Sequence, residues 1–112
     1  MLDPRVLRKE RDFNALYTKG KSMGGRFTIL FYRKNGLSFS RKGFLASKKV
    51  GNAVQRNRAR RLMKESVRLI EAETPLKTGY DVLFIARNSI NDKNCADVKK
   101  QIEAAMKRTE LI

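Results

Sequence analysis

The sequence of 112 residues contains no histidine, no tryptophan and only one cysteine. A lone cysteine, Cys95, excludes an intramolecular disulfide. Without histidine, zinc and iron–sulfur sites have almost no ligands, and the commonest general acid–base group of enzymes is missing. We therefore expect no catalytic side chain and no metal site in this chain.

Long apolar runs are also missing. No segment approaches the ~20 apolar residues of a membrane span. The first residues, MLDPRVLRKERD, lack the apolar stretch of a signal peptide. With one reduced cysteine, this composition predicts a cytoplasmic protein with no membrane partner. No repeat or low-complexity tract divides the chain, so we expect a single domain over residues 1–112.

Negative charge is absent from nearly half of the chain. Lys and Arg number 26 against 11 Asp and Glu, which gives a net charge of +15. Residues 13–64 contain no Asp or Glu but 14 Lys and Arg. The same stretch is rich in Phe, Leu, Ile and Val, so it predicts a folded basic surface rather than a disordered tail. Such a surface indicates a polyanionic partner.

Hydrophobic spacing predicts the elements of the first half. We expect a short helix over 13–19, capped by Asp12 and stopped by Gly20. RFTILFYR (26–33) is typical of a strand. After the Asn35-Gly36 turn signal, FSRKGFLAS (39–47) can return as its hairpin partner, with more strand near 47–50.

The second half predicts a long helix over residues 53 to about 70, a buried strand over 80–86, and a last amphipathic helix from Cys95 to Met106. The order is therefore α-β-β-(β)-α-β-α. This order predicts an α+β two-layer sandwich, in which helices fully cover only one face of the sheet.

The long helix has two unlike sides, and Asn52 is a plausible cap. Helical spacing places Leu62, Met63 and Ile70 on an apolar side. The opposite side carries Asn57, Arg58, Arg60, Arg61, Lys64 and Arg68. Solvated helix faces usually mix charges of both signs, and like charges at this spacing destabilise a helix. Arginine side chains and the amide groups of a helix N-terminus both bind phosphate oxygens well. We therefore expect this side of the helix to bind a nucleic-acid backbone.

The aromatic residues allow two interpretations, core or binding groove. Strand alternation predicts Phe27, Ile29 and Phe31 on one face, with Thr28, Leu30 and Tyr32 on the other. Aromatic side chains beside a cationic wall hold single-stranded nucleic acid in many proteins, because bases stack on the rings.

The segment SKKVGNAVQRNRARRLMKE resembles the signature of the bacterial ribonuclease P protein subunit, K-x-G-N-A-x-x-R-N-x-x-[KR]-R. The positions matched are Lys49, Gly51, Asn52, Ala53, Arg56, Asn57, Arg60 and Arg61. DFNALYTKGK resembles the family's D-F-x-x-[LVI]-[FY]-x-x-G segment, and YDVLFIAR follows in the family order. The resemblance covers essentially the whole chain.

This resemblance implies a protein that joins a catalytic RNA to remove the 5′ leader of precursor tRNA. Mg²⁺ would be held mainly by the RNA subunit, with none bound tightly by the protein. The implied partners are the catalytic RNA and precursor tRNA, with no obligate protein partner. The implied fold is like the second domain of ribosomal protein S5, with a left-handed β-α-β crossover.

Two sets of site residues follow from the helix face and the resemblance together. The set expected to bind the catalytic RNA is Lys49, Asn52, Arg56, Asn57, Arg58, Arg60, Arg61, Lys64 and Arg68. The set expected in a leader cleft is Phe13, Tyr17, Phe31, Tyr32 and Lys48. Which of Phe31 and Tyr32 faces the cleft stays open, and Lys48 and Lys49 can serve either surface.

Two other functions stay open at this point. A ribosomal or tRNA-binding structural protein would share the basic helix but need no leader cleft. A DNA-binding regulator would use residues 53–68 as a recognition helix, although no second helix is expected just before it.

Overall fold

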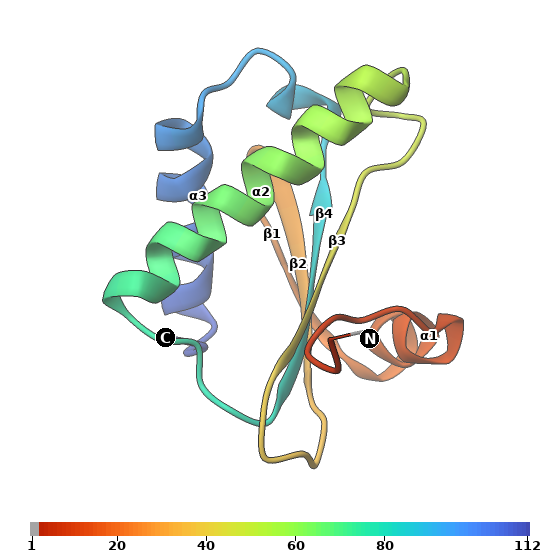
Figure 1. Ribbon diagram of the computed structural model, residues 1–112, viewed down its shortest axis with the longest axis vertical. Coiled ribbons are helices and arrows are strands. Elements are labelled where there is room, and N and C mark those ends of the chain that lie inside the picture. Colours follow the sequence, from red (N-terminus) through yellow and green to blue (C-terminus); the bar gives the residue numbers. More distant parts are fainter. Residues whose placement is uncertain (1–2) are drawn as a thin grey trace.

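A computed structural model describes residues 3–112. Its elements are α1 (Glu10–Lys19), β1 (Lys21–Gly24), β2 (Thr28–Lys34), β3 (Arg41–Leu45), α2 (Ala53–Glu73), β4 (Tyr80–Ala86), the short 3₁₀ helix η1 (Asn88–Ile90) and α3 (Cys95–Arg108) (Figure 1). The α+β class is confirmed, as are the long helix, the buried strand and the last helix. The additional strand is β1, whereas residues 47–50 form a turn in which the Val50 amide donates to the Ser47 carbonyl at 3.0 Å.

The four strands form one mixed sheet in the order β1-β2-β4-β3. β2 is antiparallel to both β1 and β4, and β3 is parallel to β4. The predicted hairpin between β2 and β3 is therefore wrong, because β4 lies between them. β4 is the most apolar strand, and the central position buries both of its faces. β3, α2 and β4 form a β-α-β crossover.

Helices lie on both sides of the sheet, with α2 and α3 on one face and α1 on the other (Figure 1). On the first face, Val82 and Phe84 of β4 join the main core with Leu30, Met63 and Ile102. On the second face, Leu83 forms a smaller cluster with Leu7 and Leu16. α1 covers this second face only in part, because Phe31, Leu45 and Ile85 are half-buried there.

The start of α1 differs from the prediction. Lys9, not Asp12, is the N-cap residue, and it makes no side-chain capping bond. Asp12 lies in the first turn, where its negative charge interacts favourably with the helix dipole. Its side chain contacts Arg41 rather than capping the helix.

The start of α2 is as predicted. The Asn52 side chain accepts from the Gln55 amide at 2.9 Å, and the Gln55 side chain accepts from the Asn52 amide at 2.9 Å. Gly51 serves this turn, because its φ is +143° and a Cβ there would collide with the Gln55 side chain.

No helix within residues 3–112 combines the length and apolar character needed to cross a membrane.

Phe84 should contribute more to folding than any surface side chain, because it is fully buried in the central strand and stacks on Phe44 at 5.2 Å between ring centroids. We expect Phe84→Ala to lower the free energy of unfolding by about 3–5 kcal/mol. Val54→Ala, at a position 76% exposed, should change it by less than about 0.5 kcal/mol. Urea unfolding of both variants measures the difference, and similar losses would contradict the central place of β4.

Candidate nucleic-acid interface

The predicted division of α2 into an apolar and a cationic side is confirmed as a structural feature. Ala59, Met63, Val67 and Ile70 are buried. The residues on the solvent side are Asn57, Arg58, Arg61, Lys64 and Arg68, which are exposed, and Arg56 and Arg60, which are half-buried. No acidic residue occupies the first turn of α2. Its N-terminal half is therefore a rigid surface that favours anions.

The cations on this surface have different local partners. Arg58 donates to the carbonyl oxygens of Asn91 at 3.0 Å and Lys93 at 2.6 Å, so it also ties α2 to the loop before α3. Arg68 forms an exposed ion pair with Glu65 at 2.5 Å. Arg60 donates to the side-chain oxygen of Asn57. The sequence could not predict this contact of Arg58, because its acceptors are backbone carbonyl groups, which every residue has.

Five of the six cations of α2 keep their charge unpaired. Within residues 3–112, no carboxylate lies at ion-pair distance from Arg56, Arg58, Arg60, Arg61 or Lys64, and only Arg68 has such a partner. Asn52 uses its side-chain oxygen in the helix cap. The strongest free positive charge on α2 therefore lies along its first three turns.

An aromatic cluster lies on the opposite face of the sheet. It consists of Phe13 and Tyr17 from α1 and Phe31 from β2. The rings of Tyr17 and Phe31 meet edge to face, with centroids 5.2 Å apart and planes at 86°. Tyr17 is 45% exposed, so its ring is accessible to a ligand.

The register of β2 decides which aromatic residues join this cluster. Phe31 lies beside α1, whereas Tyr32 points to the other face and packs against the main core. Phe27 was predicted to share a face with Phe31, and this is wrong. Phe27 precedes β2 and packs against the main core, with Lys93 Nζ 5.6 Å from its ring centroid.

A groove continues from the aromatic cluster over the part of the sheet that α1 leaves open. Its floor is Ile29 and Ile85, and Ile85 packs against the same cluster of residues as Phe31. Its basic lining is Arg26, Lys49 and Arg87, and its volume is about 610 Å³. We call this feature the sheet groove.

The sheet groove shows that some basic residues lie elsewhere than the sequence predicted. Lys49, which the motif assigned to the catalytic-RNA set, lines the groove, while Lys48 is exposed in the turn before α2. Sequence analysis missed Arg26 and Arg87. Arg26 begins one predicted strand and Arg87 follows another, but only the antiparallel pairing of the two strands, with Thr28 opposite Ala86, brings these arginines together.

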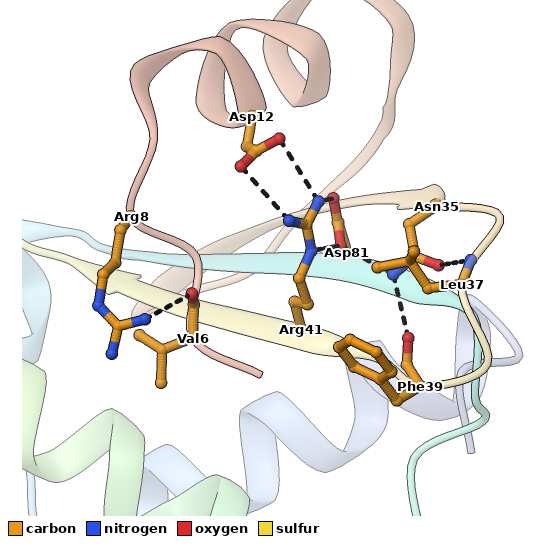
Figure 2. A network of polar contacts seen from close by, with 8 residues as sticks. All are labelled: Val6, Arg8, Asp12, Asn35, Leu37, Phe39, Arg41 and Asp81. Atoms are coloured by element: carbon orange, nitrogen blue, oxygen red, sulfur yellow. Dashed lines mark hydrogen bonds and ion pairs between the residues drawn. The ribbon is translucent and has the colours of Figure 1, made fainter. Parts of the chain in front are cut away.

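A partly buried ion-pair network fastens α1 to the sheet, as Figure 2 shows. Arg41 of β3 donates to both carboxylate oxygens of Asp81 at 2.8 and 2.6 Å, and its Nη2 lies 3.4 Å from Asp12 of α1. Asn35 donates to the same Asp81 carboxylate at 2.9 Å. The hydrogen bond and charge of Asp81 raise the pKa of Arg41 above its usual value, despite partial burial. Arg41 therefore stays charged at any working pH.

The family model described as Ribonuclease P matches residues 1–110. The chain belongs to the ribonuclease P protein family. It is 41% identical over 105 residues to the ribonuclease P protein component of Caldanaerobacter subterraneus subsp. tengcongensis, covering 94% of this chain and 89% of that one. The corresponding protein component of Clostridioides difficile is 43% identical, with 94% and 91% covered.

Solved structures of the family share the fold. The RNase P protein of Staphylococcus aureus aligns with a TM-score of 0.80 at 26% identity, covering 97% of this chain and 98% of that one. The protein from Thermotoga maritima aligns with a TM-score of 0.74 at 28% identity, covering 92% and 96%. A ribonuclease P protein component belongs to an endoribonuclease complex of tRNA 5′ processing. Nothing in these matches supports a ribosomal structural protein.

Arg41 should be required for stability, because its removal leaves the buried Asp81 carboxylate without its cation. We expect Arg41→Met to lower the free energy of unfolding by about 3 kcal/mol or more. Asp12→Asn leaves the Arg41–Asp81 pair intact and should cost less than about 1 kcal/mol. Chemical unfolding of both variants at neutral pH tests the expectation, which equal losses would contradict.

Proposed function

We propose that the basic surface of α2 binds the catalytic RNA subunit of ribonuclease P, while the aromatic cluster and the sheet groove hold the 5′ leader of precursor tRNA. The observation that carries the proposal is the separation of the two surfaces. α2 lies on one face of the sheet, and the cluster lies on the other face. One protein can therefore contact two RNA segments at the same time.

The two surfaces suit different kinds of RNA. α2 offers unpaired cations and a helix N-terminus but no exposed aromatic ring, which favours backbone phosphates. The aromatic cluster offers an accessible ring, and the adjoining sheet groove offers Arg26, Lys49 and Arg87, a combination that favours unstacked bases. A single-stranded leader has such bases, whereas a folded RNA presents mainly phosphates.

The reaction centre belongs to the RNA in this proposal. The chain has no histidine, and within residues 3–112 no three Cys, Asp or Glu side chains gather where they could hold a metal ion. Mg²⁺ would be held mainly by the RNA subunit, where it supplies the charge stabilisation that phosphodiester cleavage needs. This chain would position the substrate in the cytoplasm, without an obligate protein partner.

Tyr17 tests the leader assignment. If its ring stacks on a leader base, Tyr17→Ala in the reconstituted holoenzyme should weaken binding of precursor tRNA by about 1–3 kcal/mol. Mature tRNA, which lacks the leader, should bind as it does to the wild type. Tyr17→Phe keeps the ring and should retain the affinity. A loss of equal size for both tRNAs would show that Tyr17 serves only the fold.

Arg61 tests the catalytic-RNA assignment. Arg61→Gln should weaken assembly with the catalytic RNA and flatten the plot of log affinity against log salt by about one counterion. Lys100→Gln removes the same charge from an exposed site on α3 and is the matched control. An unchanged slope for Arg61→Gln, measured by titration of the RNA at several salt concentrations, would place this arginine in solvent.

A further inference from the structure

A second basic hollow lies at the edge of the sheet, between the turn after β1 and helix α3. Its volume is about 740 Å³. Its polar lining consists of Arg26, Arg87, Arg108 and Gln101, and Gly24 and Gly25 form one wall. We call it the arginine pocket. Neither the family motif nor the two residue sets from sequence analysis include it.

The three arginines in this pocket have no carboxylate to neutralise them. No acidic residue lines the pocket, and none of the ion pairs found within residues 3–112 involves Arg26, Arg87 or Arg108. Three guanidinium groups around one hollow repel each other, and a bound anion removes this repulsion. Guanidinium groups also offer paired donors that match the oxygens of a phosphate.

The wall of the pocket has a defined shape. Gln101 is held by a 2.8 Å hydrogen bond from Thr28 Oγ1, and Thr28 is only 1% exposed. A Cβ on Gly25 would collide with the Gln101 amide, and a Cβ on Gly24 would lie 3.2 Å from the Arg87 guanidinium. The two glycines therefore let the backbone lie close against Gln101 and Arg87.

The arginine pocket is continuous with the sheet groove. Arg26 and Arg87 line both of them. The pairing of Thr28 with Ala86 explains this, because it brings the residues just outside both strands to the same end of the sheet. A strand that follows the groove away from the aromatic cluster passes these two arginines and reaches Arg108 on α3.

We propose that the arginine pocket binds backbone phosphate of the precursor tRNA leader, at the far end of the sheet groove from the nucleotides on the aromatic cluster. This inference rests on the proposed function of the cluster. The pocket contributes charge but no aromatic ring, so it recognises phosphate irrespective of base. It makes long leaders bind more tightly than short ones.

The experiment uses holoenzyme reconstituted with the catalytic RNA and a series of precursor tRNAs whose leaders grow one nucleotide at a time. The variants are Arg26→Gln and Arg108→Gln. Lys107→Gln is the matched control, because it removes the same charge from the same end of α3 outside the pocket lining. Both arginines are exposed, so their replacement should leave the fold intact.

The wild type and the control should gain affinity when the leader becomes long enough to reach the pocket, and both arginine variants should lose that gain. For long leaders, the salt dependence should fall by about 0.7 in log–log slope for each arginine removed. Changing the bases of the upstream leader segment should have no effect on this loss.

Other outcomes overturn the inference. Equal affinities of variants and wild type at every leader length would show that the pocket takes no leader phosphate. Weaker assembly with the catalytic RNA, without dependence on leader length, would assign the pocket to that RNA instead. Tyr17→Ala, measured in the same series, distinguishes failure of this inference from failure of the proposed function. If Tyr17→Ala loses leader affinity while the arginine variants do not, the inference fails and the proposed function stands.

Discussion

The central position of β4 is the constraint on which the rest of the structure depends. Its residues alternate between two buried faces, with Val82 and Phe84 against α2 and α3, and Leu83 against α1. A strand with two apolar faces is stable only if both are covered. The chain therefore needs a helix layer on each side, and each layer carries one of the two surfaces proposed to bind RNA.

The same strand also sets how much of the second face remains open. α1 is only ten residues long, so it covers the part of the face near Leu83 and leaves Ile85 and Ile29 half-buried. Arg41 and Asp81 hold α1 at this place through Asp12. The aromatic cluster and the sheet groove lie on this face, and the arginine pocket follows at the edge of the sheet beside α3. Together they form the path proposed for a single strand of RNA.

Local signals in the sequence predicted helices and isolated strands well, and long-range pairing poorly. The spacing of Ala59, Met63 and Ile70 and the cap at Asn52 defined α2, because both are properties of neighbouring residues. The Asn35-Gly36 turn signal led to the wrong hairpin, since it carries no information on whether β4, some 40 residues later, inserts between the two strands. Arg26 and Arg87 were missed for the same reason. Only strand pairing brings these two distant residues together.

The placement of the acidic residues decides which cations are neutralised within the fold. Residues 13–64 contain no acid, so a cation of this stretch can be neutralised only by an acid from elsewhere in the chain. Asp12 and Asp81 neutralise Arg41, and Glu71 pairs with Lys42 at 2.5 Å. Both of these cations lie on β3, where they join elements of the fold.

The first turns of α2, the sheet groove and the arginine pocket receive no such partner within the described residues. Unpaired cations held close together destabilise the free protein, and a polyanion reverses this effect. The distribution of carboxylates thus determines which surfaces keep free positive charge, and these are the surfaces proposed to bind RNA.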